Sequence, residues 1–309
     1  MTVPGCIAEH HPLRAYAAIG IGGRARYFAA VVSMHDLQQA ASFARERQLP
    51  LYVLGRGSNV LIQDAAVQGV VVVLSGVFKE MSFQPGTGTV TAGAGVPLIK
   101  LGAALARRGH AGCAYMGVIP GSVGGAVRMN AGTGQGQEIA CHLLRVRVFD
   151  PIRIEESWLE KGQLQLSYRQ SILSRMSLIV LEAIFRLPDQ PEAVPGQALA
   201  GIKALFAQRR AAQPHSRQTF GSTFKNPAGV EHAAGWYLER AGMKGMRCGG
   251  AMVPHEHANW IINTGCARSD EVKELIETGQ ARVLEKFGIL LEREVVYVPE
   301  DMCPTLNPR

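Results

Sequence analysis

Apolar and polar positions in the first quarter of the chain alternate between strand-like and helix-like periods. Residues 19–32 show a glycine turn followed by a strand, and the sequence SMHD at 33–36 has the spacing of a capping box that opens a helix. Short apolar runs at 51–54 (LYVL) and after Asn59 (VLI) predict two strands, and the β-branched run GVVVVL predicts a buried one. These elements predict a compact βαββ unit that ends near residue 75.

The middle of the chain repeats this mixture of periods around its most glycine-rich segment. Pro97 suits the start of a predicted helix, LIKLGAALARR, and Gly109 suits its end. The runs LLRVRVFD and SLIVLEAIFRL predict strands on either side of LSYRQS. The polar, proline-rich stretch 188–197 then predicts a hinge or boundary, so a second unit covers residues 76–190.

The last third of the chain has mainly helical patterns and ends on one strand. We expect a basic amphipathic helix over GIKALFAQRRAA, a helix near GWYLERAG and a long helix that begins at Ser269 and stops at Gly288. The run LEREVVYVP predicts the last strand. A chain of 309 residues suits two or three compact units. We therefore expect an α+β fold with units at 1–75, 76–190 and 195–309.

Charge and cysteine usage narrow the classes of protein. The net charge of +7 indicates a solvated basic surface, a site for phosphorylated ligands, or both. No nucleic-acid-binding pattern accompanies this charge. The six cysteines form no C-x-x-C pair, so we expect reduced thiols and no metal site. The start of the chain lacks a signal-peptide pattern and no apolar run is long enough to span a bilayer. We expect a cytoplasmic protein without membrane insertion.

Two glycine-rich loops have the properties that bind a diphosphate. They are residues 55–59 (GRGSN) and 121–126 (GSVGGA), and in each a strand-like run leads into small residues whose N–H groups can converge. Ser58 and Asn59 offer additional side-chain donors. Neither loop matches the Rossmann or the P-loop pattern. One such loop alone is more often a tight turn, but two loops in neighbouring units indicate a shared dinucleotide.

These loops and several later motifs resemble one enzyme family over nearly the whole chain. The first loop resembles the LGxGSN loop of the vanillyl-alcohol-oxidase-type FAD domain. The ordered set of motifs is similar to that of the UDP-N-acetylenolpyruvoylglucosamine reductases, the MurB family, in its shorter type II subclass. In the order of the chain, the motifs are IGGRA at 21–25, LGRGSN at 54–59, IPGSVGGAVRMNAG at 119–132, YRQS at 168–171, QP at 213–214, GSTFKNP at 221–227, HAN at 257–259 and LEREV at 291–295.

The resemblance implies a fold, two cofactors and a reaction. The fold is the PCMH-type FAD-binding fold, with two α+β lobes, a C-terminal substrate domain, and a last strand near 291–298 that packs back towards the flavin lobes. The reaction is the NADPH-dependent reduction of UDP-N-acetylglucosamine enolpyruvate through FAD, for peptidoglycan synthesis. We expect a monomer that binds these small molecules and no nucleic acid. The residues implied in FAD binding are Gly55, Gly57, Ser58, Asn59, Gly121, Ser122, Gly124, Gly125, Ala126 and Asn130.

Three residues of the matching motifs suit the chemistry of an enol ether that bears a carboxylate. When hydride from flavin N5 adds to the terminal carbon, charge spreads into the carboxylate, and the planar guanidinium of Arg169 can stabilise it. Glu294 would be either neutral or balanced by Arg169, because two neighbouring carboxylates repel each other. Glu292 is its rival, since alternate strand residues share a face. Ser222 is the candidate proton donor, although a serine at this position can also serve only the turn.

The remaining candidates concern the substrate. Tyr168 can contact the nicotinamide or the substrate, or it can be a half-buried strand aromatic. Lys225 and Asn226 are candidates for the substrate diphosphate, and Arg210 is a weaker one, because helical arginines at 209–210 are often simply solvated. Alanines at 17 and 18 replace threonines that are usual in the family.

Two other functions compete with the reductase. One is another FAD-dependent oxidoreductase of the same fold that acts on a small alcohol or sugar, and the other is a non-catalytic basic nucleotide-binding protein. The GSTFKNP and HAN segments in the last third of the chain disfavour the first alternative. The second explains the charge but leaves Arg169, Ser222 and Glu294 without a role.

Overall fold

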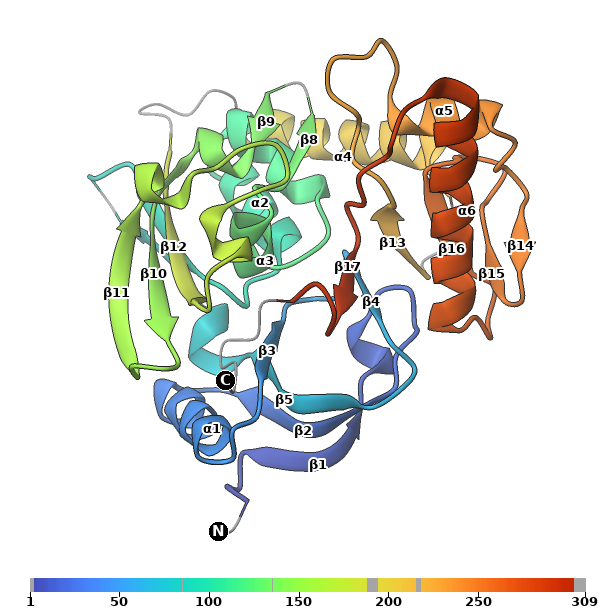
Figure 1. Ribbon diagram of the computed structural model, residues 1–309. Helices are drawn as coiled ribbons and strands as arrows, with labels where there is room; N and C mark the ends of the chain where they lie inside the picture. The colour runs from blue at the N-terminus through green and yellow to red at the C-terminus, as the bar shows by residue number, and fades with distance from the viewer. Residues whose placement is uncertain (1–2, 85, 135, 188–193, 215–217, 303–309) are drawn as a thin grey trace.

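The computed structural model describes residues 3–84, 86–134, 136–187, 194–214 and 218–302. Three sheets, each with its own helices, surround a central region in which the chain's last strand lies (Figure 1). This mixture of segregated helices and largely antiparallel sheets confirms the α+β class. Within the described residues, no helix combines the length and the apolar character needed to cross a membrane.

The first sheet is formed by the N-terminal part of the chain. Its strands, in spatial order, are β1 (Ile7–Pro12), β2 (Arg24–Val31), β5 (Val67–Leu74) and β3 (Leu51–Leu54). The last three are mutually parallel and β1 adds antiparallel to β2. Helix α1 (Met34–Glu46) begins with the predicted capping box, in which Asp36 N donates to Ser33 Oγ and Ser33 N to Asp36. The polar sequence of β1 gave no strand signal, because β1 is an exposed edge.

The second sheet is antiparallel throughout. Its strands, in spatial order, are β11 (Glu155–Glu160), β10 (Leu143–Asp150), β12 (Ile179–Arg186), β7 (Thr89–Gly93) and β6 (Met81–Gln84). Helices α2 (Leu98–Ala106) and α3 (Val123–Arg128) and the small hairpin of β8 (Gly132–Gly134) and β9 (Gln137–Glu138) belong to the same region. The glycine-rich segment predicted as a loop thus contains the short helix α3, which Ser122 caps by accepting from Gly125 N.

Helix α4 (Pro195–Ala212) connects the second sheet to the third. It begins inside the stretch 188–197 that we predicted to be a hinge, because Pro195 occupies the first helical turn, where proline is tolerated. The rest of that stretch, 188–193, lies outside the described residues. Ala198 and Ile202 of α4 pack against Ala114 and Val118, so this helix lies on the second region.

The third sheet lies on the opposite side of the central region. Its strands, in spatial order, are β13 (Thr219–Ser222), β16 (Trp260–Asn263), β15 (Ala251–Met252) and β14 (Arg247–Cys248), with helices α5 (Ala234–Arg240) and α6 (Ser269–Phe287). As predicted, α6 begins at Ser269 and ends at Gly288, whose φ of +68° is the left-handed conformation of a helix C-cap. Short 3₁₀ helices occur at Arg14–Tyr16, Gly76–Lys79, Ala111–Val118, Ile139–Cys141, Lys161–Leu164 and Ile172–Ser174.

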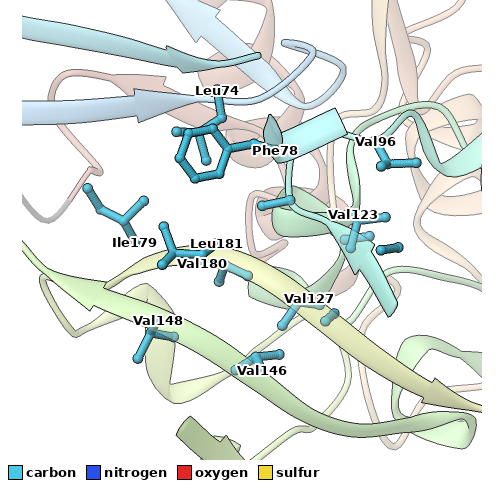
Figure 2. Packing of buried hydrophobic residues seen from close by; sticks show 14 of the residues in the cluster. Leu74, Phe78, Val96, Val123, Val127, Val146, Val148, Ile179, Val180 and Leu181 are labelled. Atoms are coloured by element: carbon cyan, nitrogen blue, oxygen red, sulfur yellow. The ribbon is translucent and has the colours of Figure 1, made fainter. Parts of the chain in front are cut away.

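We call the three large sheets, each together with its helices, the first, second and third regions. Two large apolar cores join these regions in pairs. In the first core, Leu74 and Phe78 pack over Ile179 and Leu181 of β12, and the residues of α1 and of the second sheet belong to the same cluster (Figure 2). The second core combines residues of the first region, such as Phe28, with residues of the third, such as Phe220. The first region is therefore packed against both of the others.

The last strand, β17 (Val296–Val298), does not join the third sheet. It pairs in parallel with β4 (Val60–Ile62), which directly follows the first glycine loop, and Val296 lies opposite Val60. The chain thus returns from the third region to the glycine loops near its end (Figure 1).

Candidate functional site

The two glycine loops, far apart in sequence, touch each other. Ser58 Oγ donates to the carbonyl oxygen of Pro120 at 3.2 Å, and a Cβ at Gly55 would lie 2.6 Å from Ser122 Oγ. Gly57 has a φ of +64°, and a Cβ there would lie 1.9 Å from the carbonyl oxygen of Tyr16. Only glycine therefore fits at Gly57, and the two loops form one continuous backbone surface.

Two adjoining cavities follow this surface. The first, of about 340 Å³, lies between the ends of β3 and β5 and helix α3, and its wall combines apolar strand residues with basic side chains such as Arg56 and Lys79. The second, of about 240 Å³, reaches Arg169, Ser222 and Glu294. Gly55, Ser122 and Gly125 line both cavities. The two cavities form an elongated groove that crosses both glycine loops, which is the shape that a dinucleotide needs.

The lining of this groove fits FAD. Nine of the ten residues implied in FAD binding line at least one cavity: Gly55, Gly57, Ser58, Asn59, Gly121, Ser122, Gly124, Gly125 and Ala126. The N–H groups of Val123 and Gly124 in the first turn of α3 donate to the carbonyl oxygens of Val96 and Ala94, so the backbone of the small residues in loop 55–59 is the more accessible to a diphosphate. The apolar part of the first cavity, at the ends of β3 and β5, suits an aromatic ring.

The tenth residue, Asn130, lies beneath the groove and lines neither cavity. It is fully buried, its Nδ2 donates to the Ser167 carbonyl oxygen at 2.9 Å, and its Oδ1 accepts from Ala140 N at 3.0 Å. Asn130 therefore supports the turn that carries Arg169, and its part in FAD binding stays a prediction. The sequence does not reveal this role, because Ser167 is 37 positions away.

The side chains of Ser58 and Asn59 are also bonded within the protein. Both were expected to offer donors to a diphosphate, but Ser58 donates to Pro120 and Asn59 Nδ2 donates to the carbonyl oxygen of Glu294 at 2.9 Å. Each side chain thus has a partner within the protein, and its contact with a diphosphate stays a prediction beside that of the loop's backbone N–H groups.

Arg169 and Glu294 form a half-buried ion pair at one wall of the second cavity. Arg169 Nε lies 2.9 Å from Glu294 Oε1, each side chain is 15% exposed, and Arg169 Nη2 donates to the Gly132 carbonyl oxygen. Burial raises the pKa of the Glu294 carboxyl above its usual range, although Arg169 and, more weakly, Lys225 act in the opposite direction. The ion pair suits a Glu294 balanced by Arg169 and the raised pKa suits a neutral one, so both predicted alternatives stay open.

The rival carboxylate, Glu292, lies elsewhere. Regular strand structure begins only at Val296, so the expectation of a strand that starts at Leu291 is wrong. The preceding residues instead pair irregularly with the GSTFKNP segment, since Lys225 N donates to the Glu292 carbonyl oxygen and Glu294 N to that of Thr223. The Glu292 side chain is 67% exposed, forms an ion pair with Lys225 and does not line the second cavity.

Ser222 lies at the end of β13, opposite Trp260 of β16. The following residues are clamped by Asn259, whose Oδ1 accepts from Phe224 N and whose Nδ2 donates to the Phe224 carbonyl oxygen, each at 2.9 Å. Ser222 itself lines the second cavity, and its Oγ makes no hydrogen bond to any residue that the structure describes. This hydroxyl is therefore available to a ligand.

The predicted substrate residues are divided between two places. Tyr168 is 45% exposed, its ring lies 5.1 Å from Arg169 Cζ, and its hydroxyl accepts from Asn226 N. Lys225 instead lines a third cavity, of about 510 Å³, that adjoins the Arg169–Glu294 pair. Asn226 Oδ1 accepts from Ala234 N at the start of α5, and the side chain of Arg210 lies outside what the structure describes.

Two arginines of the groove had no assigned role in the sequence, where Arg209 was considered only as part of a solvated helical pair. Arg209, at the end of α4, lines the second cavity, and burial together with the charge of Arg169 lowers its pKa. Arg128, at the end of α3, lines both cavities and donates to the carbonyl oxygens of Leu173 and Ser174. The basic composition gave the general signal, but only the packing of α3 and α4 shows which arginines face the groove.

Comparisons with known proteins agree with this site. The model of the UDP-N-acetylenolpyruvoylglucosamine reductase C-terminal domain matches residues 213–298, and the model of an FAD binding domain matches residues 25–151. A reductase of that name from Desulforamulus reducens is 36% identical over 299 residues, which cover 97% of this chain and 96% of the relative. One from Chlamydia muridarum is 36% identical over 296 residues, which cover 96% of each chain.

A solved structure shows the same similarity in three dimensions. The crystal structure of the UDP-N-acetylenolpyruvylglucosamine reductase MurB from Thermus caldophilus is 34% identical, with a TM-score of 0.76 over 95% of this chain and 98% of that one. These matches support neither an alcohol or sugar oxidase nor a non-catalytic nucleotide-binding protein. With a PCMH-type flavin fold and relatives that span its length, this chain belongs to the UDP-N-acetylenolpyruvoylglucosamine reductase family of FAD-dependent oxidoreductases.

Proposed function

We propose that the protein acts as a cytoplasmic monomer that reduces UDP-N-acetylglucosamine enolpyruvate to UDP-N-acetylmuramate, with NADPH as the reductant, in peptidoglycan precursor synthesis. The observation that carries this proposal is one cavity in which a cation, a carboxyl and an available hydroxyl meet beside the glycine loops. These groups are Arg169, Glu294 and Ser222.

We assign cofactor and substrate to different parts of the chain. Residues 1–75 and 76–190 would hold FAD through the backbone of loops 55–59 and 121–126, and residues 195–309 would hold the sugar nucleotide. The chemistry supplied by bound FAD is transfer of a hydride from NADPH, through flavin N5, to the terminal carbon of the enol ether.

Arg169 and Glu294 would stabilise the charge that develops on the substrate. Hydride addition moves an electron pair towards the substrate carboxylate, and the guanidinium can bind that carboxylate because only its Nε and Nη2 have partners among the described residues. A Glu294 carboxyl whose pKa is raised by burial can share a proton with the same oxygens.

Ser222 would complete the reaction. Its hydroxyl donates a proton to the carbon that carries the ether oxygen, so that hydride and proton add across the double bond. The serine regains its proton from solvent. Clamping of the next two residues by Asn259 keeps this hydroxyl at the cavity wall.

Cations around the cavity would bind the substrate diphosphate. Arg209 faces the cavity and Arg210 follows it on α4, while Tyr168 and Asn226 lie beside each other at the same end of the Arg169 turn. Lys225 would contribute from the far side of the ion pair once Glu292 releases it.

The proposal is tested by following NADPH oxidation by the FAD-loaded protein with and without UDP-N-acetylglucosamine enolpyruvate. We expect turnover that depends on this substrate and that collapses in Ser222→Ala while FAD stays bound. An exposed serine of β6 provides the control Ser82→Ala, which should behave as wild type. Flavin that is reduced by NADPH but never reoxidised by the sugar nucleotide would overturn the proposed function.

A further inference from the structure

The peptide groups on either side of Glu294 are held by two different regions of the molecule. On one side, Glu294 N donates to the Thr223 carbonyl oxygen at 2.9 Å, next to Ser222. On the other side, the Glu294 carbonyl oxygen accepts from Asn59 Nδ2 at 2.9 Å. The Asn59 carbonyl oxygen in turn accepts from Val296 N at 3.1 Å.

Asn59 is thus bonded to the Glu294 segment through both its side chain and its backbone. Asn59 is the last residue of the first glycine loop, and Glu294 lies 235 positions after it in the sequence. The parallel pairing of β17 with β4 begins at the very next position, where Val296 lies opposite Val60. The side-chain bond extends this ladder by one more contact, to the residue that carries the carboxyl.

We infer that Asn59 is a positioning residue, which fixes the carboxyl of Glu294 relative to the flavin loop by holding the Glu294 carbonyl oxygen. The inference rests on the proposed function, because it assigns Glu294 a role in the reaction. It gives Asn59 a different role from that of the neighbouring glycines, whose backbone would contact FAD. A carboxyl displaced by a fraction of an ångström from its productive place loses much of its effect.

The chain offers a matched control in Asn263. Its Nδ2 also donates to a backbone carbonyl oxygen across a long sequence distance, that of Ile19 at 3.0 Å, and it also joins the third region to the first. Asn263 lines none of the three cavities described above. Loss of its side chain therefore removes a comparable bond, together with the two bonds that its Oδ1 accepts from Gly265 N and Ala267 N, without touching the Glu294 segment.

The test separates the two halves of the reaction in the FAD-loaded protein. Asn59→Ala should bind FAD with the wild-type dissociation constant and be reduced by NADPH at the wild-type rate. Reoxidation of its flavin by UDP-N-acetylglucosamine enolpyruvate should slow by about 10- to 100-fold, the scale of a misplaced catalytic group. Asn263→Ala should lower the melting temperature without separating the two half-reactions.

A double-mutant cycle shows whether Asn59 acts through Glu294. When the side chain at position 294 is removed by Glu294→Ala, there is nothing left to position, so the addition of Asn59→Ala should cause no further loss in reoxidation rate. Equal losses in both backgrounds would overturn the inference. If Asn59→Ala does not fold, Asn59→Asp asks the same question, because it keeps the volume and removes the N–H donor.

The remaining outcomes are also distinct. Weaker FAD binding by Asn59→Ala, with unchanged reoxidation at saturating FAD, would make Asn59 a cofactor residue and overturn the inference. Failure of wild-type flavin to be reoxidised by the enolpyruvate would instead overturn the proposed function. The wild-type measurement therefore tells the two failures apart.

Discussion

Arg169 lies in the left-handed region of the backbone, with a φ of +55°. For a residue with a Cβ this conformation costs about 1–2 kcal/mol. The turn is maintained by hydrogen bonds between Ser167 and Gln170 and by Asn130, which donates to the Ser167 carbonyl oxygen. The strained residue is also the one that pairs with Glu294, so the strain and the chemistry share a location, as is common in active sites.

Removal of the guanidinium should raise the pKa of Glu294 further. Burial already raises it, and Arg169 is the main influence that lowers it, so Arg169→Gln leaves burial less opposed. We expect a ¹³C-carboxyl NMR titration to show Glu294 protonating at higher pH than in wild type. Turnover should fall by about 100- to 1000-fold, as for the loss of one charge-stabilising group.

The stability effect has a defined sign. Because the folded state raises the pKa of Glu294, ionisation of Glu294 opposes folding, and stability falls as pH rises from the ordinary glutamate value of 4.5 through the raised pKa. This slope should be steeper in Arg169→Gln. An exposed arginine provides the control Arg153→Gln, which should leave the titration of Glu294 unchanged. An unaltered Glu294 titration in Arg169→Gln would contradict the argument.

Sequence reasoning went furthest where a residue's chemistry was sufficient. The motifs led us to expect Arg169, Ser222 and Glu294 at one site, and all three line one cavity. The ion pair between Arg169 and Glu294 was one of the two arrangements expected for Glu294. Sequence reasoning missed the backbone bonds of Asn130 and Asn59, because an asparagine amide is equally suited to a ligand and to a distant backbone. Only the fold decides which one is within reach.

At the scale of elements, helix α6 is anchored by a residue from another region. Asp64, which follows β4, accepts from Ser269 N at 2.6 Å and from Ser269 Oγ at 2.8 Å, and Asp64 N donates to Ser269 Oγ. The first turn of α6 carries Asp270 and Glu271, as the sequence suggested, and Glu271 accepts from Arg268 N. The partly buried contact, however, comes from 205 positions away.

Loss of this contact should loosen the attachment of α6. Asp64→Ala removes a charged acceptor from a partly buried N–H and hydroxyl, so we expect a loss of about 2 kcal/mol in the free energy of unfolding, measured with urea. Asp270, at the same end of the helix, is 66% exposed and pairs with Arg268 at the surface. Asp270→Ala should cost less than about 1 kcal/mol. Equal losses in the two variants would contradict this assignment.

Elements with strong apolar periods were predicted well, and polar or glycine-rich ones were not. Helices α1 and α6 begin at the expected residues because their caps are local. Strand β11 was missed because its sequence, EESWLE, is exposed along an edge. Helix α3 was missed because Gly124 and Gly125 disfavour helix on propensity alone, and packing against β7 and β12 overrides it.

At the scale of the molecule, the boundaries visible in the sequence do not divide the core. The second core takes Leu13, Phe28 and Leu61 from the first region and Phe220, Leu275 and Val295 from the third. The first core joins the first region to the second in the same way (Figure 2). Units that look separable by sequence pattern thus depend on a shared interior, which no local pattern could show.

The third region should therefore not fold by itself. A fragment of residues 213–302 exposes the half of the second core that Leu13 and Phe28 cover in the whole chain, and its β17 lacks β4 as a partner. We expect poor amide dispersion in its ¹⁵N–¹H NMR spectrum and no cooperative thermal transition. The full chain, measured in parallel, should show a cooperative thermal transition. A well-dispersed spectrum from the fragment would show that the third region has a sufficient core of its own.

The bond between Asn59 and Glu294 also fixes an order of events during protein synthesis. Asn59, at the end of the first glycine loop, is synthesised 235 residues before Glu294, whose carbonyl oxygen it binds. At typical elongation rates of about 5–20 residues per second, this is a delay of about 10–50 seconds. Both glycine loops of a nascent chain can therefore form well before Glu294, the last of the three proposed catalytic residues, has been synthesised. Chains terminated early lack the carboxyl altogether, so reductase activity reports on translation to the end of the third region.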